Sequence, residues 1–184
     1  MTDPSIAGVG LIGHARSGKS TLARALSAEI PGSAVVSFGD AVRARAESGG
    51  MDASDRSVLI DLGQRWVSSD PEAFCRAVLQ RAAQPHTLLI IDGIRHAHVA
   101  ELLRELLGPR RLILAYLQLA KPTLLARLTE SGVSSQRAAD LLNDPTEVEI
   151  DGSLRTVADL ELDATKPPAD SVAAIQAALG RQPG

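Results

Sequence analysis

The sequence predicts an α/β fold in which helices cover both faces of a parallel sheet. Short apolar segments alternate along the chain with segments whose apolar residues recur at helical spacing, a pattern typical of a parallel sheet. A glycine-rich loop follows the first apolar segment, which places a ligand site at the carboxyl ends of the strands. The chain has 184 residues, 45% of them hydrophobic, so we expect a single domain with a substantial core.

The loop at residues 13–20 carries the strongest functional signal. Its sequence, Gly-His-Ala-Arg-Ser-Gly-Lys-Ser, fits the phosphate-binding pattern G-x-x-x-x-G-K-[ST] without a mismatch. Glycines let backbone N–H groups face phosphate oxygens, Lys19 supplies a charge for the β- and γ-phosphates, and Ser20 a hydroxyl for Mg²⁺. We therefore predict a nucleoside triphosphate site. Its cofactor-binding residues are Gly13, His14, Ala15, Arg16, Ser17, Gly18, Lys19, Ser20 and Thr21.

The first half of the chain predicts two strands, at 9–12 and 34–37. The helices expected there lie at about 18–30, from Phe38 to the glycines at 49 and 50, at about 54–67, and from Pro71 onward. The last of these has a strong start signal, because Asp70 suits the N-cap and Pro71 the first helical position. These helices, inserted between the second and third strands, form a candidate substrate arm at about 38–83.

The clearest strand lies in the second half, at 87–92, a continuous apolar run that ends in Asp92 and is typical of a strand buried on both faces. The other strands expected there are 111–118 and 159–163. The expected helices are about 97–107, about 121–130, a short one from the cap Ser134 through Leu142, and about 169–179, with a turn at 143–145. The polar stretch near the turn is a candidate lid at about 127–150.

Asp92 and Arg95 are candidate site residues at the end of this strand. Asp92 would hold the water shell of Mg²⁺ opposite Ser20, and the alternative is a turn-forming residue before Gly93. Arg95 offers a guanidinium fork for a phosphate, and the alternative is a surface arginine.

Asp40 and Arg43 lie one helical turn apart, just after the second strand. Asp40 would orient an acceptor oxygen or take its proton, and Arg43 would hold an acceptor phosphate. An exposed ion pair of little consequence is the alternative. Arg127 and Arg137 flank the polar stretch, where lid arginines would neutralise charge on a transferring phosphoryl group.

Several other residues carry weaker signals. His96 and His98 form a His-x-His pair at the start of a predicted helix, where side chains two residues apart diverge. No third ligand is obvious, so we expect neither to bind a metal, although His96 would lie near the substrate. Phe38 or Trp66 would suit stacking on a base, but we expect Trp66 in the core.

Composition and charge exclude several classes of partner. Four aromatic residues and a formal net charge of −3 provide neither a stacking platform nor a basic field for nucleic acid. No apolar run approaches the ~20 residues of a membrane span, and no signal-peptide pattern is apparent. The single cysteine, Cys75, excludes an internal disulfide and suits a reducing compartment. We expect a cytoplasmic protein without a nucleic-acid or membrane partner.

Four stretches resemble P-loop kinases of the nucleoside monophosphate kinase group, above all the phage-type deoxynucleoside monophosphate kinases and the dephospho-coenzyme A kinases. They are residues 13–20, 37–43, 62–64 with the following Asp70-Pro71, and 91–96. Residues 144–147, Asp-Pro-Thr-Glu, also resemble the segment that follows the lid in such proteins. The resemblance implies a three-layer P-loop NTPase fold with a five-stranded parallel sheet, a helical substrate arm and a short lid without zinc-binding cysteines.

The resemblance also implies roles for individual residues. The implied catalytic residues are Lys19, Asp40, Arg95 and Arg127. The implied substrate-binding residues are Phe38, Asp40, Arg43, Arg95 and Arg137, and the implied metal ligands are Ser20 and Asp92. The backbone around Ala164-Thr165 would lie against the donor base, although these kinases often carry an Asn at this point of the chain.

These observations predict an ATP-dependent kinase that uses Mg²⁺ and moves the γ-phosphoryl group to a small phosphorylated acceptor, as a monomer or homodimer. A nucleoside or deoxynucleoside monophosphate is the expected acceptor. The alternatives are a kinase of a non-nucleotide metabolite such as dephospho-coenzyme A, and a nucleotide-dependent regulatory ATPase. No Asn-Lys-x-Asp signature supports a guanine-specific switch.

Overall fold

The described residues form a single sheet of five parallel strands, as predicted. The computed structural model describes residues 6–83, 85–108, 111–143 and 145–180. The sheet has the order β2-β3-β1-β4-β5. Its strands are β1 (Ile6–Ile12), β2 (Ser33–Ser37), β3 (Leu88–Ile94), β4 (Arg111–Gln118) and β5 (Leu160–Asp163), and every neighbouring pair is parallel.

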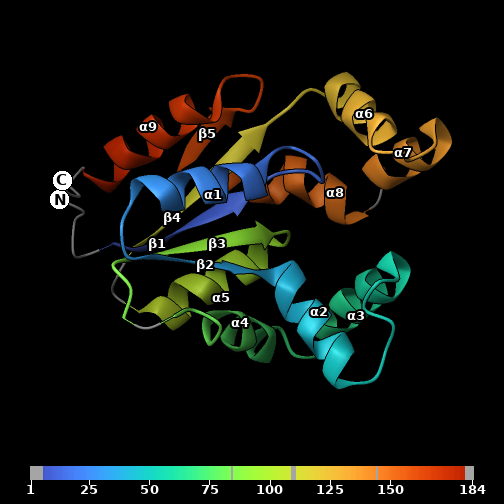
Figure 1. The fold of residues 1–184 in the computed structure, drawn as a ribbon, viewed down its shortest axis with the longest axis horizontal. Coiled ribbons are helices and arrows are strands. Elements are labelled where there is room, and N and C mark those ends of the chain that lie inside the picture. The colour runs from blue at the N-terminus through green and yellow to red at the C-terminus, as the bar shows by residue number, and fades with distance from the viewer. Residues whose placement is uncertain (1–5, 84, 109–110, 144, 181–184) are drawn as a thin grey trace.

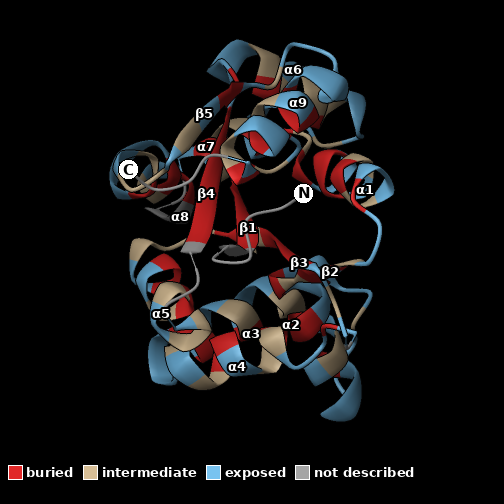
Figure 2. Ribbon diagram, turned by 90° about the vertical axis from the view of Figure 1, so that its left-hand side faces the viewer, coloured by how far each residue is buried: buried red, intermediate tan, exposed pale blue. Residues whose placement is uncertain are grey.

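Helices cover both faces of this sheet, which gives three layers (Figure 1). Helices α1 (Lys19–Glu29) and α9 (Pro168–Leu179) cover one face. The other face carries α2 (Phe38–Ser48), α4 (Pro71–Leu79), α5 (Ala97–Leu107) and the π-helical turn η1 (Ile150–Leu154). Residues of β3 alternate between the two cores, because successive side chains of a strand point to opposite faces. Leu88 and Ile90 pack with α1, whereas Leu89 and Ile91 pack on the opposite side. Figure 2 shows the buried positions concentrated on the central strands.

Two helical segments extend beyond the carboxyl ends of the strands (Figure 1). One contains α2 and α3 (Arg56–Ser69), between β2 and β3. The other contains α6 (Lys121–Glu130), α7 (Ser135–Leu142) and α8 (Pro145–Glu149), after β4. Helices α6 and α7 pack around a small core of their own, formed by Leu119, Leu124, Leu128, Ala138 and Leu142.

The helix start signals are confirmed where they were strongest. Asp70 caps α4 by accepting a hydrogen bond from the Ala73 N–H at 2.9 Å, and Pro71 occupies the first helical position. Ser134 caps α7 through the Arg137 N–H at 3.3 Å. Trp66 is buried in the core, stacked on Phe74, as expected. Burial also raises the pKa of the Cys75 thiol to about 11, which fits a packed side chain rather than a nucleophile.

Two element boundaries differ from the prediction. Asn143 forms a turn after α7, as expected, but α8 begins at Pro145 and is followed by η1, and Asp144 lies outside the described residues. Strand β3 does not end at Asp92 but continues to Ile94. In the described part of the chain, no helix is both long and apolar enough to span a membrane.

Candidate functional site

The loop at 13–20 connects the carboxyl end of β1 to the first turn of α1. Two of its glycines have conformations that suit no other residue. Gly13 has φ 151°, and a Cβ there would lie 2.8 Å from Ser17 Oγ and 3.1 Å from Leu117 O. Gly18, the N-cap of α1, has φ 103°. The loop is therefore shaped around the N-terminus of a helix, a favourable place for an anion.

Lys19 is folded back onto the loop. Its ammonium donates hydrogen bonds to Gly13 O at 2.7 Å and His14 O at 2.6 Å, and the residue is 8% exposed. Burial, assisted by the nearby charge of Arg95, lowers the pKa of Lys19 to about 8. An anion in the loop would favour the charged ammonium and offer it a stronger partner than the two carbonyls.

Ser20 and Asp92 lie together, as predicted. Ser20 Oγ donates to Asp92 Oδ2 at 2.6 Å. Asp92 Oδ1 is buried and has no hydrogen-bond partner among the described residues. A hydroxyl beside a carboxylate with an unpartnered oxygen suits Mg²⁺, a hard cation that prefers oxygen ligands. The donor set therefore fits the metal that the sequence predicts here.

A β-bulge at Gly93 sets the position of Asp92. Leu11 of β1 pairs with Asp92 and Ile12 pairs with Ile94, so Gly93 has no opposing residue. Gly93 has φ 91°, which a residue with a side chain rarely adopts. The strand therefore bends after Asp92 and continues to Ile94, directly before Arg95.

A cavity of about 580 Å³ opens beside the loop. Its wall includes Lys19 and Ser20 from the loop region, residues of α2, α3 and α4, Leu141 and Leu142 of α7, and Asp92 and Arg95. The arginines in the wall are Arg16, Arg43, Arg56 and Arg95. Asp92 and Glu147 are the carboxylates among the described wall residues. This cavity therefore joins the phosphate-binding loop to a region rich in guanidinium groups.

Glu147 joins the two sides of this site. One oxygen accepts from the guanidinium of Arg95, and the other accepts from His14 Nδ1 at 2.6 Å. Burial opposes ionisation of Glu147, but the hydrogen bond from His14 and the charge of Arg95 outweigh it and hold the pKa at about 2. Glu147 is therefore ionised at neutral pH.

His14 has an acidic partner at each ring nitrogen. Its Nε2 lies 2.7 Å from Asp151 Oδ1, which also accepts from the Tyr116 hydroxyl at 2.8 Å. Burial lowers the pKa of His14, but the hydrogen bonds to Glu147 and Asp151 outweigh it and raise the pKa above its ordinary value of 6.5. Both nitrogens donate only in the imidazolium form, so the geometry favours a charged His14. The sequence pattern leaves this position open, and the only signal was an ionisable residue inside the loop.

The remaining predicted residues divide into two groups. Arg43 and Phe38 are in the cavity wall, and Phe38 also packs edge-on against Phe74 at 4.9 Å between ring centroids. Asp40 and Arg137 are exposed and are not among the wall residues. Within the described residues no ion pair joins Asp40 to Arg43. The structure therefore brings Arg43, but not Asp40, to the cavity.

Arg127 of α6 contacts the backbone of the loop at 13–20. Its guanidinium donates to Arg16 O at 3.3 Å, to Ser17 O at 3.4 Å and to Ala164 O at 3.3 Å. It thereby links α6 both to the loop and to the segment after β5.

The remaining predicted residues of the loop differ in their exposure. Ser17 Oγ is buried and has no hydrogen-bond partner in the described part of the chain. Ala15 lines the cavity, and Thr21 lies exposed on α1.

Comparisons with known proteins agree with this architecture. The sequence model of a family described as AAA domain matches residues 9–149. No curated protein matches the chain. A gluconokinase from Sinorhizobium meliloti 1021 is 19% identical, with a TM-score of 0.58 covering 97% of this chain and 94% of that chain. Shikimate kinase from Bacteroides thetaiotaomicron is 15% identical, with a TM-score of 0.62 covering 95% of this chain and 99% of that chain. Shikimate kinase from Aquifex aeolicus is 18% identical, with a TM-score of 0.57 covering 93% and 95%. These likenesses confirm the predicted α/β fold.

Proposed function

The chain belongs to the AAA domain family, and we propose that it is an ATP-dependent kinase that moves the γ-phosphoryl group to a small anionic acceptor. One observation carries the proposal. Lys19 and the Ser20–Asp92 pair line the same cavity as Arg43 and Arg95. Groups suited to a triphosphate and its metal therefore face groups suited to a second anion, which is the arrangement that transfer between two bound substrates needs.

On the donor side, the loop and the N-terminus of α1 would hold the phosphates of ATP. Lys19 would exchange its two carbonyl partners for phosphate oxygens, and Ser20 and Asp92 would hold Mg²⁺ and its water shell. Bound Mg²⁺ neutralises the charge that builds on the phosphates. Arg127 and the backbone at Ala164 would lie near the donor base, with a lid at about 127–150 covering it.

On the acceptor side, an arm at about 38–83 would supply Phe38 and Arg43, and the segment after β3 would supply Arg95. Neither carboxylate of the described wall is placed to act as a general base. Asp92 is placed for the metal, and Glu147 has a pKa of about 2 and is occupied by His14 and Arg95. Transfer of a phosphoryl group through a loose transition state needs little proton removal. The enzyme would thus act mainly by positioning and charge neutralisation, and a role for Asp40 as base stays a prediction.

The acceptor class has two candidates. The resemblance to nucleoside monophosphate kinases favours a nucleoside or deoxynucleoside monophosphate, whose phosphate Arg43 and Arg95 would bind. A non-nucleotide metabolite is the second candidate, because the similar solved structures are named gluconokinase and shikimate kinase. A guanidinium fork matches a carboxylate as well as a phosphate.

A coupled ADP-release assay with Mg²⁺-ATP tests the proposal. The panel contains the common ribo- and deoxynucleoside monophosphates, dephospho-coenzyme A, gluconate, shikimate and a control without acceptor. We expect strong stimulation by one acceptor. Lys19→Ala should lower that turnover by at least about a hundredfold, whereas Lys121→Ala, an exposed lysine outside the cavity wall, should leave it unchanged. Slow hydrolysis that no acceptor stimulates would instead favour a regulatory ATPase.

A further inference from the structure

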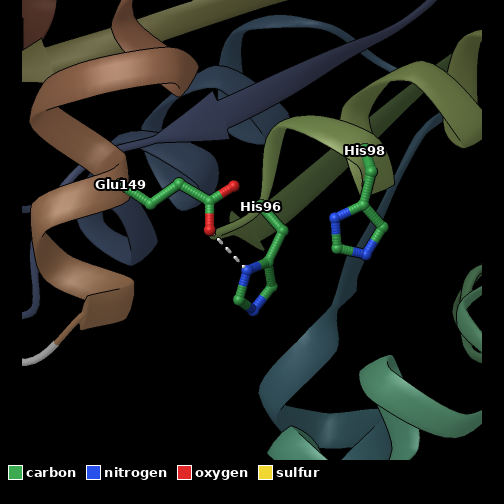
Figure 3. Close-up of side chains that lie close together, drawn as sticks. All are labelled: His96, His98 and Glu149. Atoms are coloured by element: carbon green, nitrogen blue, oxygen red, sulfur yellow. Dashed lines mark hydrogen bonds and ion pairs between the residues drawn. The ribbon is translucent and has the colours of Figure 1, made fainter.

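His96, His98 and Glu149 form a second cluster of ligand atoms (Figure 3). A ring nitrogen of His96, a ring nitrogen of His98 and a carboxylate oxygen of Glu149 all lie within 4.8 Å of one another. The histidines come from the start of α5 and the glutamate from the end of α8. His96 also belongs to the cavity wall. We propose that His96, His98 and Glu149 form a binding site for a divalent transition cation of the Zn²⁺ class, separate from the Mg²⁺ position at Ser20 and Asp92.

The two histidines converge because His96 is not part of the helix. It is the N-cap residue of α5, with the extended dihedrals φ −135° and ψ 136°. Side chains two residues apart diverge on a helix but share a side in extended backbone. The His96 and His98 rings therefore lie 5.4 Å apart between centroids. From the sequence we expect neither histidine to bind a metal, because side chains two residues apart diverge on a helix. That reason does not apply to His96, which lies before the first helical residue.

Glu149 provides the third ligand that the sequence alone did not reveal. Its Oε1 accepts a hydrogen bond from the Ala97 N–H at 2.9 Å, and its Oε2 accepts from His96 Nδ1 at 2.9 Å. The backbone N–H thus orients the carboxylate, as the supporting hydrogen bonds of metal-binding carboxylates do. A cation would take the place of the proton on His96 Nδ1 and leave the Ala97 bond intact.

His98 has the freedom to complete the site. It is exposed and makes no hydrogen bond to another residue in the described part of the chain. Ligands bound to Zn²⁺ at 2.0–2.1 Å in a tetrahedron lie roughly 3.3 Å apart. A small rotation of the His98 side chain would therefore bring it into range, whereas His96 and Glu149 are already close enough.

The donor set selects the cation. Two imidazoles and one carboxylate match the His₂Glu set of zinc sites that keep a fourth position open, whereas Mg²⁺ prefers oxygen ligands throughout. A bound cation would join the start of α5 to the end of α8. Arg95, just before α5, and Glu147, in α8, form an ion pair next to it. The site therefore couples a transition metal to the acceptor wall without using the phosphate-binding loop.

Calorimetric titration with Zn²⁺ tests the site without any measurement of kinase activity. Tag-free protein is titrated in saturating Mg²⁺ and without nucleotide, and Co²⁺ absorption reports the coordination geometry. We expect one Zn²⁺ per chain, bound in the micromolar range. His98→Gln should weaken binding at least about tenfold, while His86→Gln, at a half-buried histidine outside the cluster, should bind as the wild type does.

Three results would overturn the proposal. The wild type could bind no Zn²⁺, or His98→Gln could bind Zn²⁺ with the affinity of the wild type. In the third, Ser20→Ala rather than His98→Gln would lose Zn²⁺ binding. His98→Gln carries the test because its side chain supports no described hydrogen bond, so the variant should keep the wild-type melting temperature. Glu149→Gln is a second variant, expected to weaken Zn²⁺ binding and to lower the melting temperature because Glu149 also caps α5.

Discussion

At the scale of single residues, Glu147 connects the donor and acceptor sides of the cavity, because its two oxygens accept from His14 in the loop and from Arg95 in the opposite wall. It is 5% exposed, so these partners replace water almost completely. A buried charge that loses a partner is costly, since neither solvent nor another group compensates it. The position of the loop and the position of Arg95 therefore depend on the same carboxylate.

We predict that Glu147→Gln lowers the free energy of unfolding by about 2 kcal/mol near neutral pH, because it leaves His14 and Arg95 with a neutral partner. The pKa of Glu147 falls from 4.5 to about 2 on folding, so its contribution is present above pH 4.5 and is lost as the pH falls toward 2. The pKa of His14 is raised above 6.5, so its contribution is present below pH 6.5 and is lost as the pH rises through the raised value. The difference between wild type and variant should be largest between pH 4.5 and 6.5.

Urea unfolding below, within and above that pH window measures this difference. Glu105→Gln is the matched control, because Glu105 is exposed on α5 and belongs to no described ion pair. A loss of stability that is the same at every pH would contradict the assignment of His14 as an imidazolium held by Glu147.

At the scale of elements, the bulge in β3 links the sheet to the chemistry. Gly93 lies between Asp92, which faces Ser20, and Arg95, which faces Glu147. Its φ of 91° lets the strand bend between them. Strand β3 therefore places two groups with different tasks at one end of the sheet.

We predict that Gly93→Ala lowers the free energy of unfolding by about 1–2 kcal/mol, because a Cβ makes this backbone conformation unfavourable. The added Cβ meets only Phe38 Cβ at 3.9 Å, so strain rather than collision is the cause. Relief of the strain would move Asp92, and activity should then need more Mg²⁺. Denaturant unfolding and a Mg²⁺ titration of turnover measure the two effects. Gly180→Ala, at φ −87° and ψ −7°, should change neither.

Elements with strong local signals could be predicted from the sequence. The apolar run before Asp92 identified β3, and Asp70 and Ser134 identified the starts of α4 and α7. The sequence predicts that this strand ends at Asp92, because the glycine that follows marks a bulge and a turn equally well. Helix α8 was missed because its five residues are too few to show a helical period.

The candidate site likewise contains some residues that a local sequence pattern reveals and others that only the folded structure brings together. The loop at 13–20 is contiguous, so its sequence alone identifies it as a candidate phosphate site, and the apolar run before Asp92 indicated that this carboxylate lies near it. His14 and Glu147 are 133 residues apart, so no local pattern relates them. Asp40 and Arg43 share one turn of α2, but packing of α2 brings only Arg43 to the cavity wall. Long-range pairing and the orientation of a helix depend on tertiary packing, which periodicity does not contain.

At the scale of the whole molecule, the two helical segments extend past the carboxyl ends of the strands (Figure 1), and both contribute residues to the wall of the cavity. Leu59 and Gly63 of α3 line it from one side, and Leu141 and Leu142 of α7 from the other. Helices α6 and α7 have a separate small core, and Arg127 links α6 to the loop at 13–20. A nucleotide held between these parts would stabilise the folded chain by mass action, since the unfolded chain has no such site.

We predict that Mg²⁺-ATP at about 100 times its dissociation constant stabilises the protein by about 2.7 kcal/mol. For a chain of this length that corresponds to a rise in melting temperature of roughly 5–10 °C. Thermal unfolding followed by fluorescence or calorimetry measures the shift. Lys19→Ala should lose most of it, and removal of Mg²⁺ with a chelator should reduce it, because Ser20 and Asp92 then lack the cation that joins them to the phosphates. A wild-type shift that persists in Lys19→Ala would place the nucleotide outside the loop at 13–20 and remove the basis of the kinase proposal.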